Sequence, residues 1–91
     1  MKKRVHLFIT GDVVGVGFRT WMRRMAHQFN IAGWVRNADN QTVEAVIEGD
    51  PKSVESMIAV SRQGPDVCWV KNLSAKPEQI ESPLVGFEIK A

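Results

Sequence analysis

Residues 5–37, VHLFITGDVVGVGFRTWMRRMAHQFNIAGWVRN, contain two different hydrophobic periods separated by a glycine-rich loop. In residues 5–10 apolar side chains alternate, which is the period of a strand with one buried face. After the loop, apolar residues recur three and four positions apart, which predicts an amphipathic helix with this stripe: Phe18, Trp21, Met22, Met25, Ala26 and Phe29. Asn30 can end that helix, Gly33 predicts a bend, and residues 34–37 predict a second strand.

The second half of the chain repeats this order of elements. Residues 37–41 predict a turn, and the alternation in residues 43–48 predicts a third strand that returns antiparallel to the second. Asp50 is a good N-cap with Pro51 at the first helical position, so a second helix is expected from there to about Gln63. Its inward stripe should be Val54, Met57, Ile58 and Ser61. The Gly64-Pro65 pair then stops the helix.

Two more strands complete the pattern. Residues 67–75 are rich in strand-forming residues, residues 76–85 predict a loop, and residues 86–89 predict a short edge strand. The order is therefore β-α-β-β-α-β with one strand appended. Such a split βαβ arrangement places both helices on one face of an antiparallel sheet of four to five strands, the ferredoxin-like α+β sandwich.

Length and composition limit the possible classes. The 91 residues suffice for one domain, so residues 1–91 are expected to form a single unit. The apolar stretch behind the basic start is interrupted by His6, Thr10 and Asp12, so neither an export signal nor a membrane span is expected. A single cysteine, Cys68, cannot form an internal disulfide, which fits the cytoplasm. We expect its thiol to be packed beside Trp69.

Basic residues gather in the first third of the chain. The net charge is only +2, but residues 1–36 hold seven basic residues against Asp12 alone. This asymmetry favours an anionic ligand near the first helix, although part of it is also expected of a solvated helix face.

The loop between the first strand and the first helix has the features of an anion site. Glycines at positions 11, 15 and 17 leave the backbone free of side chains, so its N–H groups can converge at the helix N-terminus. Arg19 adds a permanent charge and a planar fork that fits two phosphate oxygens. The alternative is a tight strand-to-helix connection followed by a surface arginine.

Several kinds of chemistry can be set aside. No Lys-Ser or Lys-Thr follows Gly17, as a nucleotide-triphosphate loop requires, and Thr20 stands where a dinucleotide fingerprint has its third glycine. The loop holds no Cys, Ser or His nucleophile, and no His/Asp/Glu cluster has the spacing of metal ligands, so no cofactor and no metal are expected. An acyl phosphate suits such a site, because its carboxylate leaves without protonation. Asn37 is the best candidate to orient the attacking water, although an Asn that ends a strand is commonly a turn residue.

Two blocks of the sequence resemble the acylphosphatase family. They are Gly11-x-Val13-x-Gly15-Val16-Gly17-Phe18-Arg19 and Gly33-Trp34-Val35-x-Asn37 with Val43-Glu44 behind it. Gly64-Pro65 and Gly86-Phe87-x-Ile89 match as well, so the resemblance covers essentially the whole chain.

The resemblance implies hydrolysis of the carboxyl-phosphate bond to a carboxylate and inorganic phosphate, without metal or cofactor. The phosphate is then expected on Arg19 and the backbone amides of the loop, namely Val14, Gly15, Val16, Gly17, Phe18 and Arg19. Asn37 is expected to position the water. Two departures are visible: Val14 stands where the family usually has glutamine, and Asn40-Gln41 replaces the common Asp-Gly hairpin turn.

Two other functions remain open on the sequence. One is a phosphate-binding module without turnover. The other is RNA binding, for which Phe8 and Trp34 could supply exposed aromatics on the sheet, but no RNA-binding motif is recognisable and tryptophans are more commonly core residues. The expectation is therefore a monomeric cytoplasmic hydrolase that acts on a small acyl phosphate and contacts neither nucleic acid nor membrane.

Overall fold

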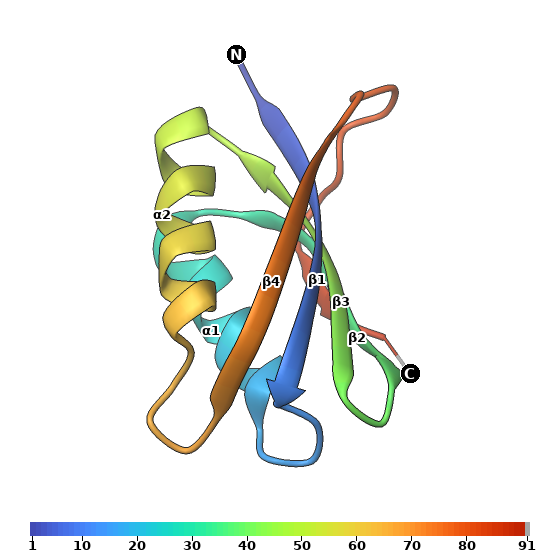
Figure 1. Ribbon diagram of the computed structural model, residues 1–91. Helices are drawn as coiled ribbons and strands as arrows, with labels where there is room; N and C mark the ends of the chain where they lie inside the picture. Colours follow the sequence, from blue (N-terminus) through green and yellow to red (C-terminus); the bar gives the residue numbers. More distant parts are fainter. Residues whose placement is uncertain (91) are drawn as a thin grey trace.

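The computed structural model describes residues 1–90, which form one five-stranded sheet with two helices on the same face (Figure 1). The strand order is β4-β1-β3-β2-β5. The elements are β1 (Lys3–Asp12), α1 (Phe18–Phe29), β2 (Ala32–Asp39), β3 (Thr42–Gly49), α2 (Pro51–Gln63), β4 (Trp69–Glu78) and β5 (Phe87–Ile89). This arrangement confirms the predicted ferredoxin-like class.

The hydrophobic core lies between the helices and the sheet. Val5, Leu7 and Ile9 of β1 face the helices and are at most 2% exposed, as the alternation predicted. Phe18, Met22 and Ala26 of α1 cover them, and Val54, Met57 and Ser61 of α2 do the same on their side. The hydrophobic period of each segment therefore predicted correctly which of its faces is buried.

The fifth strand differs from the expected antiparallel sheet. β5 pairs with β2 in parallel, with Gly33 opposite Phe87 and Val35 opposite Ile89. β4 ends at the same end of the sheet at which β2 and β5 begin, so the loop after β4 only has to cross from one edge of the sheet to the other. The sheet is therefore mixed, with one parallel pair at its edge.

Gly33 lies inside β2 rather than at a bend. Its φ is +147°, and a Cβ there would lie 1.8 Å from the carbonyl oxygen of Val46 on β3. Its N–H donates to the carbonyl oxygen of Gly86, at 2.9 Å. The glycine is required because the backbone of β3 approaches so closely.

Three other expectations need correction at element boundaries. β4 begins at Trp69 and continues to Glu78, through a segment predicted as loop; Pro77 fits there because β4 is an edge strand. Cys68 precedes the strand; it is half-buried but packs against the core, as expected, and burial raises the pKa of its thiol. The side chain of Asp50 makes no capping hydrogen bond, although its carbonyl accepts from the Val54 N–H.

The hairpin between β2 and β3 closes without glycine. Only Asn40 and Gln41 lie outside the strands, and within residues 1–90 the one non-glycine residue with positive φ is Asn30. A register shift at Ala38, between Asn37 and Asp39, provides the extra twist that a left-handed turn would otherwise supply. The Gln41 N–H donates to the Asp39 carboxylate at 2.8 Å, and this bond lowers the pKa of Asp39.

Candidate functional site

The loop after β1 presents an open stretch of backbone. Val13 anchors it in the core at 1% exposure, and Val14 packs against the core from the side. Gly15 and Gly17 have φ values of +80° and +84°, and a Cβ at either position would meet nothing within 4 Å. These glycines therefore allow a left-handed backbone and leave the space in front of it empty.

Within the described residues 1–90, no amide of residues 14–19 donates a hydrogen bond of good geometry to the protein. Among residues 1–90, the first amide of this region that donates a hydrogen bond is that of Trp21, to the Gly17 carbonyl at 3.0 Å. The preceding N–H groups of the loop and of the first turn of α1 therefore remain free. Free donors at the positive end of a helix form a binding site for an anion.

Arg19 lies in the first turn of α1, next to these amides. Its side chain is half-buried, and in the part of the chain that the structure describes no carboxylate or carbonyl pairs with it. The first turn also contains no acidic residue. The guanidinium charge of Arg19 is thus available to an external anion.

Asn37 stands near the end of β2, where its side chain points to the helix side of the sheet. It follows Gly33 and Val35 on that face, both of them buried. Its Oδ1 is buried and has no hydrogen-bond partner among residues 1–90. A buried amide oxygen without a partner is costly unless a water or ligand donates to it, so this atom marks a place for one.

The structure brings these elements to one end of the molecule. The loop, the start of α1 and the β2–β3 hairpin all lie at the lower end in Figure 1. The Gly11 N–H donates to the Gln41 carbonyl at 3.1 Å, which ties the beginning of the loop to the hairpin. Asn37, Val43 and Ile9 lie in one row across β2, β3 and β1. Arg19 and Asn37 share this end but do not hydrogen-bond to each other.

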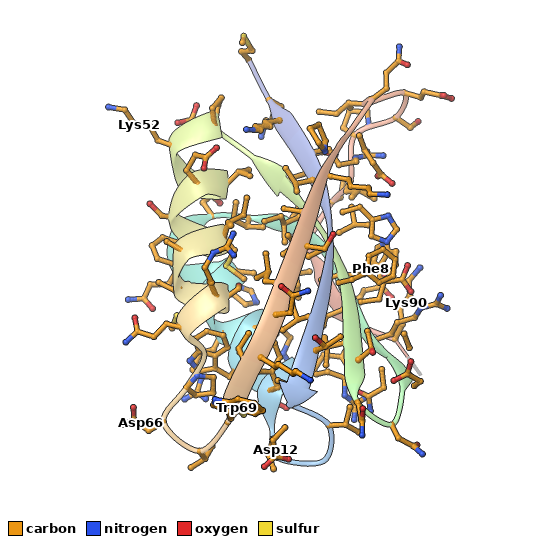
Figure 2. The ribbon with its side chains drawn as sticks, in the orientation of Figure 1. Phe8, Asp12, Lys52, Asp66, Trp69 and Lys90 are labelled. Atoms are coloured by element: carbon orange, nitrogen blue, oxygen red, sulfur yellow. The ribbon has the colours of Figure 1, made fainter. Side chains whose placement is uncertain are left out.

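The larger hollows of the surface lie beside this site. One of about 780 Å³ is bordered by Asp12, Trp69 and Lys71, and Figure 2 shows Asp12 and Trp69 together at that end. Another of about 580 Å³ lies along α1, next to Phe87 of β5.

An ion-pair network on the other face of the sheet was not predicted from the sequence. Glu44 of β3 is 7% exposed and accepts hydrogen bonds from Arg36 Nε, at 2.7 Å, and from His6 Nε2, at 2.6 Å. Burial opposes its ionisation, but these bonds outweigh burial and lower the pKa of Glu44. The available signal was the alternation itself, which placed most of the polar residues of β1 and β3 on one face, with Phe8 and Val46 among them.

A second ion pair on the same face holds the last loop. Arg4 Nε donates to Glu48 Oε1 at 2.7 Å, and Arg4 Nη2 donates to the Ser82 carbonyl at 2.6 Å. The Leu84 N–H donates to the other oxygen of Glu48, at 3.2 Å. This pair fixes the loop from β4 to β5 and has no connection with the anion site.

Of the three tryptophans, Trp21 packs against the core, as its place on the helical stripe predicted, whereas Trp34 and Trp69 do not. Trp69 is 62% exposed, and Trp21 and Trp34 are half-buried. Figure 2 shows Phe8 and Lys90 on the side of the sheet away from the helices, where the Lys90 ammonium lies 4.8 Å from the centre of the Trp34 ring. The aromatic residues considered for RNA are therefore on the open face, among the paired charges.

Comparison with known proteins gives the family. A family model described as acylphosphatase matches residues 5–89. This chain belongs to the acylphosphatase family. A Thermococcus kodakarensis acylphosphatase is 49% identical over 86 residues, covering 94% of this chain and 93% of that relative. The crystal structure of a Bacillus subtilis acylphosphatase has a TM-score of 0.92 at 27% identity, with both chains covered completely.

A third comparison agrees. A structure of a Coxiella burnetii acylphosphatase has a TM-score of 0.91 at 27% identity and covers 98% of this chain and 93% of its own. The predicted family is thus confirmed, and the comparisons support acyl phosphate hydrolysis over a non-catalytic binding module. Among residues 1–90, no helix is long and apolar enough to cross a membrane.

Proposed function

We propose that the backbone amides of residues 14–19 and the Arg19 guanidinium bind the phosphoryl group of an acyl phosphate, while Asn37 positions the attacking water. The observation that carries this assignment is the set of unpaired amides at the start of α1, beside an arginine without a carboxylate partner. Each of these donors can form a charge-assisted hydrogen bond to a phosphate oxygen.

The reaction requires little from the protein beyond positioning. The water oxygen forms a bond to phosphorus as the bond between phosphorus and the acyl oxygen breaks. The acyl group leaves as a carboxylate, which needs no proton, and a proton of the water passes to an oxygen of the phosphate itself. Arg19 and the amides stabilise the negative charge on the phosphoryl oxygens, which is the main term in such a transfer.

The buried Oδ1 of Asn37 fits the role of a water acceptor. It can accept one proton of the water, while the side-chain NH₂ is able to donate to a phosphoryl oxygen. Occupation by water would also satisfy a buried acceptor that the protein leaves without a partner. The bulge at Ala38 is adjacent and orients this end of β2.

The proposal also covers the number of domains, the oligomeric state, the compartment and the metal requirement. We propose a single domain of residues 1–91 that works as a monomer in the cytoplasm, without metal, on a small molecule. A lone cysteine fits a reducing compartment. Nucleic acid is not proposed as a ligand, because the basic side chains of Arg4, His6 and Arg36 on the open face already pair with carboxylates of the protein.

Benzoyl phosphate hydrolysis, followed with and without a metal chelator, tests the proposal. We expect turnover with an unchanged kcat/KM in chelator. No turnover of any simple acyl phosphate would contradict the function. Loss of turnover in chelator, with recovery on adding a divalent cation, would contradict only the metal-free mechanism.

A further inference from the structure

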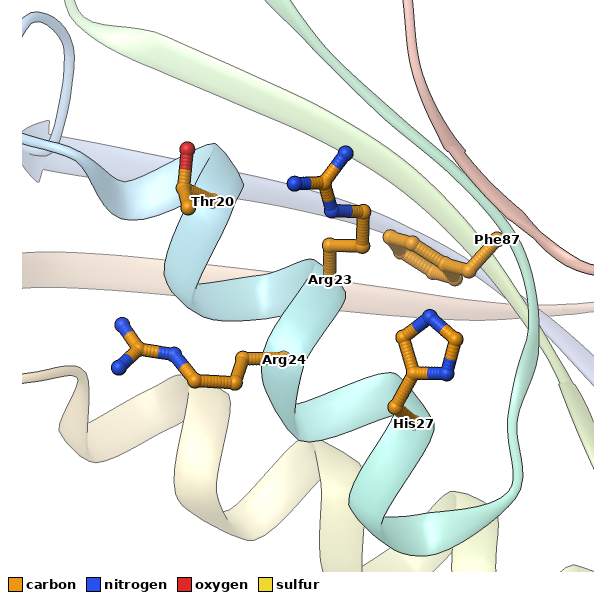
Figure 3. Close-up of a pocket in the computed structure, with 5 residues that line it drawn as sticks. All are labelled: Thr20, Arg23, Arg24, His27 and Phe87. Carbon is orange, nitrogen blue, oxygen red and sulfur yellow. The ribbon is translucent and has the colours of Figure 1, made fainter.

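A column of basic side chains continues from the phosphate loop along α1. Arg19, Arg23 and His27 are spaced four residues apart, so they lie on one flank of the helix. Arg23 follows Arg19 by about 6 Å along the axis, at 1.5 Å per residue. Side chains on a helix lean toward its N-terminus, and the Arg23 side chain in Figure 3 extends in that direction, level with Thr20.

The column borders a hollow of ligand size. The hollow measures about 580 Å³ and lies between α1 and β5, with Thr20, Arg23, Arg24 and His27 on one side and Phe87 on the other. Figure 3 shows the Phe87 ring beside Arg23 and His27, while Arg24 points away from it. A volume of this order is typical of sites for small molecules, about 300–1,000 Å³.

No internal partner uses these charges. Among residues 1–90, the five salt bridges involve Lys3, Arg4, His6 and Arg36, and none reaches α1. The sequence of α1 contains no acidic residue, and the side chains of Arg23 and His27 are exposed. The flank thus presents positive charge to an external group only.

We propose that Arg23 binds a second anionic group at the far end of the acyl chain, so that the preferred substrates are acyl phosphates whose acyl part carries a carboxylate or a phosphate. This proposal rests on the function proposed above. With the phosphoryl group on Arg19 and the loop, the acyl part extends along the column, packs against Phe87, and places its second anion within reach of the Arg23 guanidinium. The hollow then acts as the acyl subsite.

A rigid pair of substrates tests this inference. 4-Carboxybenzoyl phosphate carries a carboxylate opposite its reactive group, and 4-carbamoylbenzoyl phosphate is its neutral counterpart of nearly the same shape. 3-Carboxybenzoyl phosphate and 3-carbamoylbenzoyl phosphate form a second pair, in which the charge lies at a different position of the ring. The measured quantity is the ratio of kcat/KM for the charged substrate to that for the neutral one.

We expect a ratio of about 5 to 10 for at least one pair in the unmodified protein, the size of a partly exposed, charge-assisted contact. In Arg23→Gln the ratio should fall to about 1, and in Arg23→Lys it should be intermediate because the charge remains without the planar fork. Arg62→Gln removes an exposed arginine from the last turn of α2 and should leave the ratio unchanged.

The possible failures are distinct. If the neutral substrates are hydrolysed but neither charged substrate is favoured, the second-anion subsite is wrong. The same conclusion follows if the preference survives in Arg23→Gln or disappears equally in Arg62→Gln. If no acyl phosphate is hydrolysed at all, the function proposed above is wrong, and the subsite falls with it.

Discussion

The arginines of α1 and those of the sheet's open face are of the same residue type but have opposite environments. Arg4 and Arg36 donate to the buried glutamates Glu48 and Glu44 within the protein. Arg19, at the start of α1, has no such partner among residues 1–90. Charges that stabilise the fold are therefore paired on one face of the sheet, and charges available to a ligand are on the other. Substitutions of Arg19, Asn37 and Glu44 test this separation.

Arg19→Ala should have the largest effect. It removes the guanidinium in the first turn of α1, next to the free amides, so kcat/KM for benzoyl phosphate should fall by at least about 10³-fold. Inhibition by inorganic phosphate should be lost together with turnover, while the melting temperature stays near that of the unmodified protein. Phosphate inhibition that persists at full strength would show that Arg19 does not bind the phosphoryl group.

Asn37→Ala should separate turnover from binding. Without an acceptor for the water, kcat should fall by about 10²-fold, whereas the inhibition constant of inorganic phosphate should change little. Asn37→Asp is the matched control, because it keeps the shape but places a negative charge toward the phosphate and should weaken its binding. Equal loss of turnover and phosphate affinity in Asn37→Ala would contradict its role as the residue that orients the water.

Glu44→Gln should affect stability and leave catalysis intact. The substitution weakens the bonds of a buried carboxylate to Arg36 and His6. The free energy of unfolding should fall by about 1–2 kcal/mol, since Arg36 is partly exposed. Glu55→Gln is the control, because its partner Lys3 and Glu55 itself are exposed, and the change there should stay below about 0.5 kcal/mol. A fall in kcat/KM without a loss of stability would break the separation of the two faces.

The smallest expected effect is the pH dependence of the stability difference between the unmodified protein and Glu44→Gln. Because the pKa of Glu44 is lowered in the folded protein, its contribution to stability is complete above the ordinary value of 4.5 and is lost as pH falls through the lower folded value. Chemical denaturation at several pH values should therefore show the difference between the unmodified protein and Glu44→Gln shrinking below that pH. A difference that grows on acidification would contradict the ionised pairing.

The sequence predicted the parts of the fold that depend on local patterns. The stripe from Phe18 to Phe29 gave α1, and the glycines at 15 and 17 gave the loop, since each signal lies within a few residues. The parallel pairing of β5 and the close approach at Gly33 could not be predicted in this way. Both depend on which strands become neighbours, which no single segment encodes.

Only part of the candidate site could likewise be predicted from the sequence. Arg19 and the loop amides were recognisable because they lie together in the sequence. The position of Asn37 at the same end depends on the β2–β3 hairpin, and its buried, unpartnered Oδ1 is visible only in the structure. The His6–Glu44 bond joins residues 38 positions apart, so its pairing required the strand register. Arg23 was only one of the seven basic residues counted in residues 1–36.

The most direct test of the central claim is a titration of the ¹⁵N-labelled protein with inorganic phosphate, followed by amide chemical shifts. The account predicts that the amides of residues 14–19 shift together and saturate at the concentration that inhibits hydrolysis, while those of His6 and Glu44 on the open face remain in place. Unchanged amides in residues 14–19 at inhibitory phosphate, or shifts centred on the open face, would contradict it.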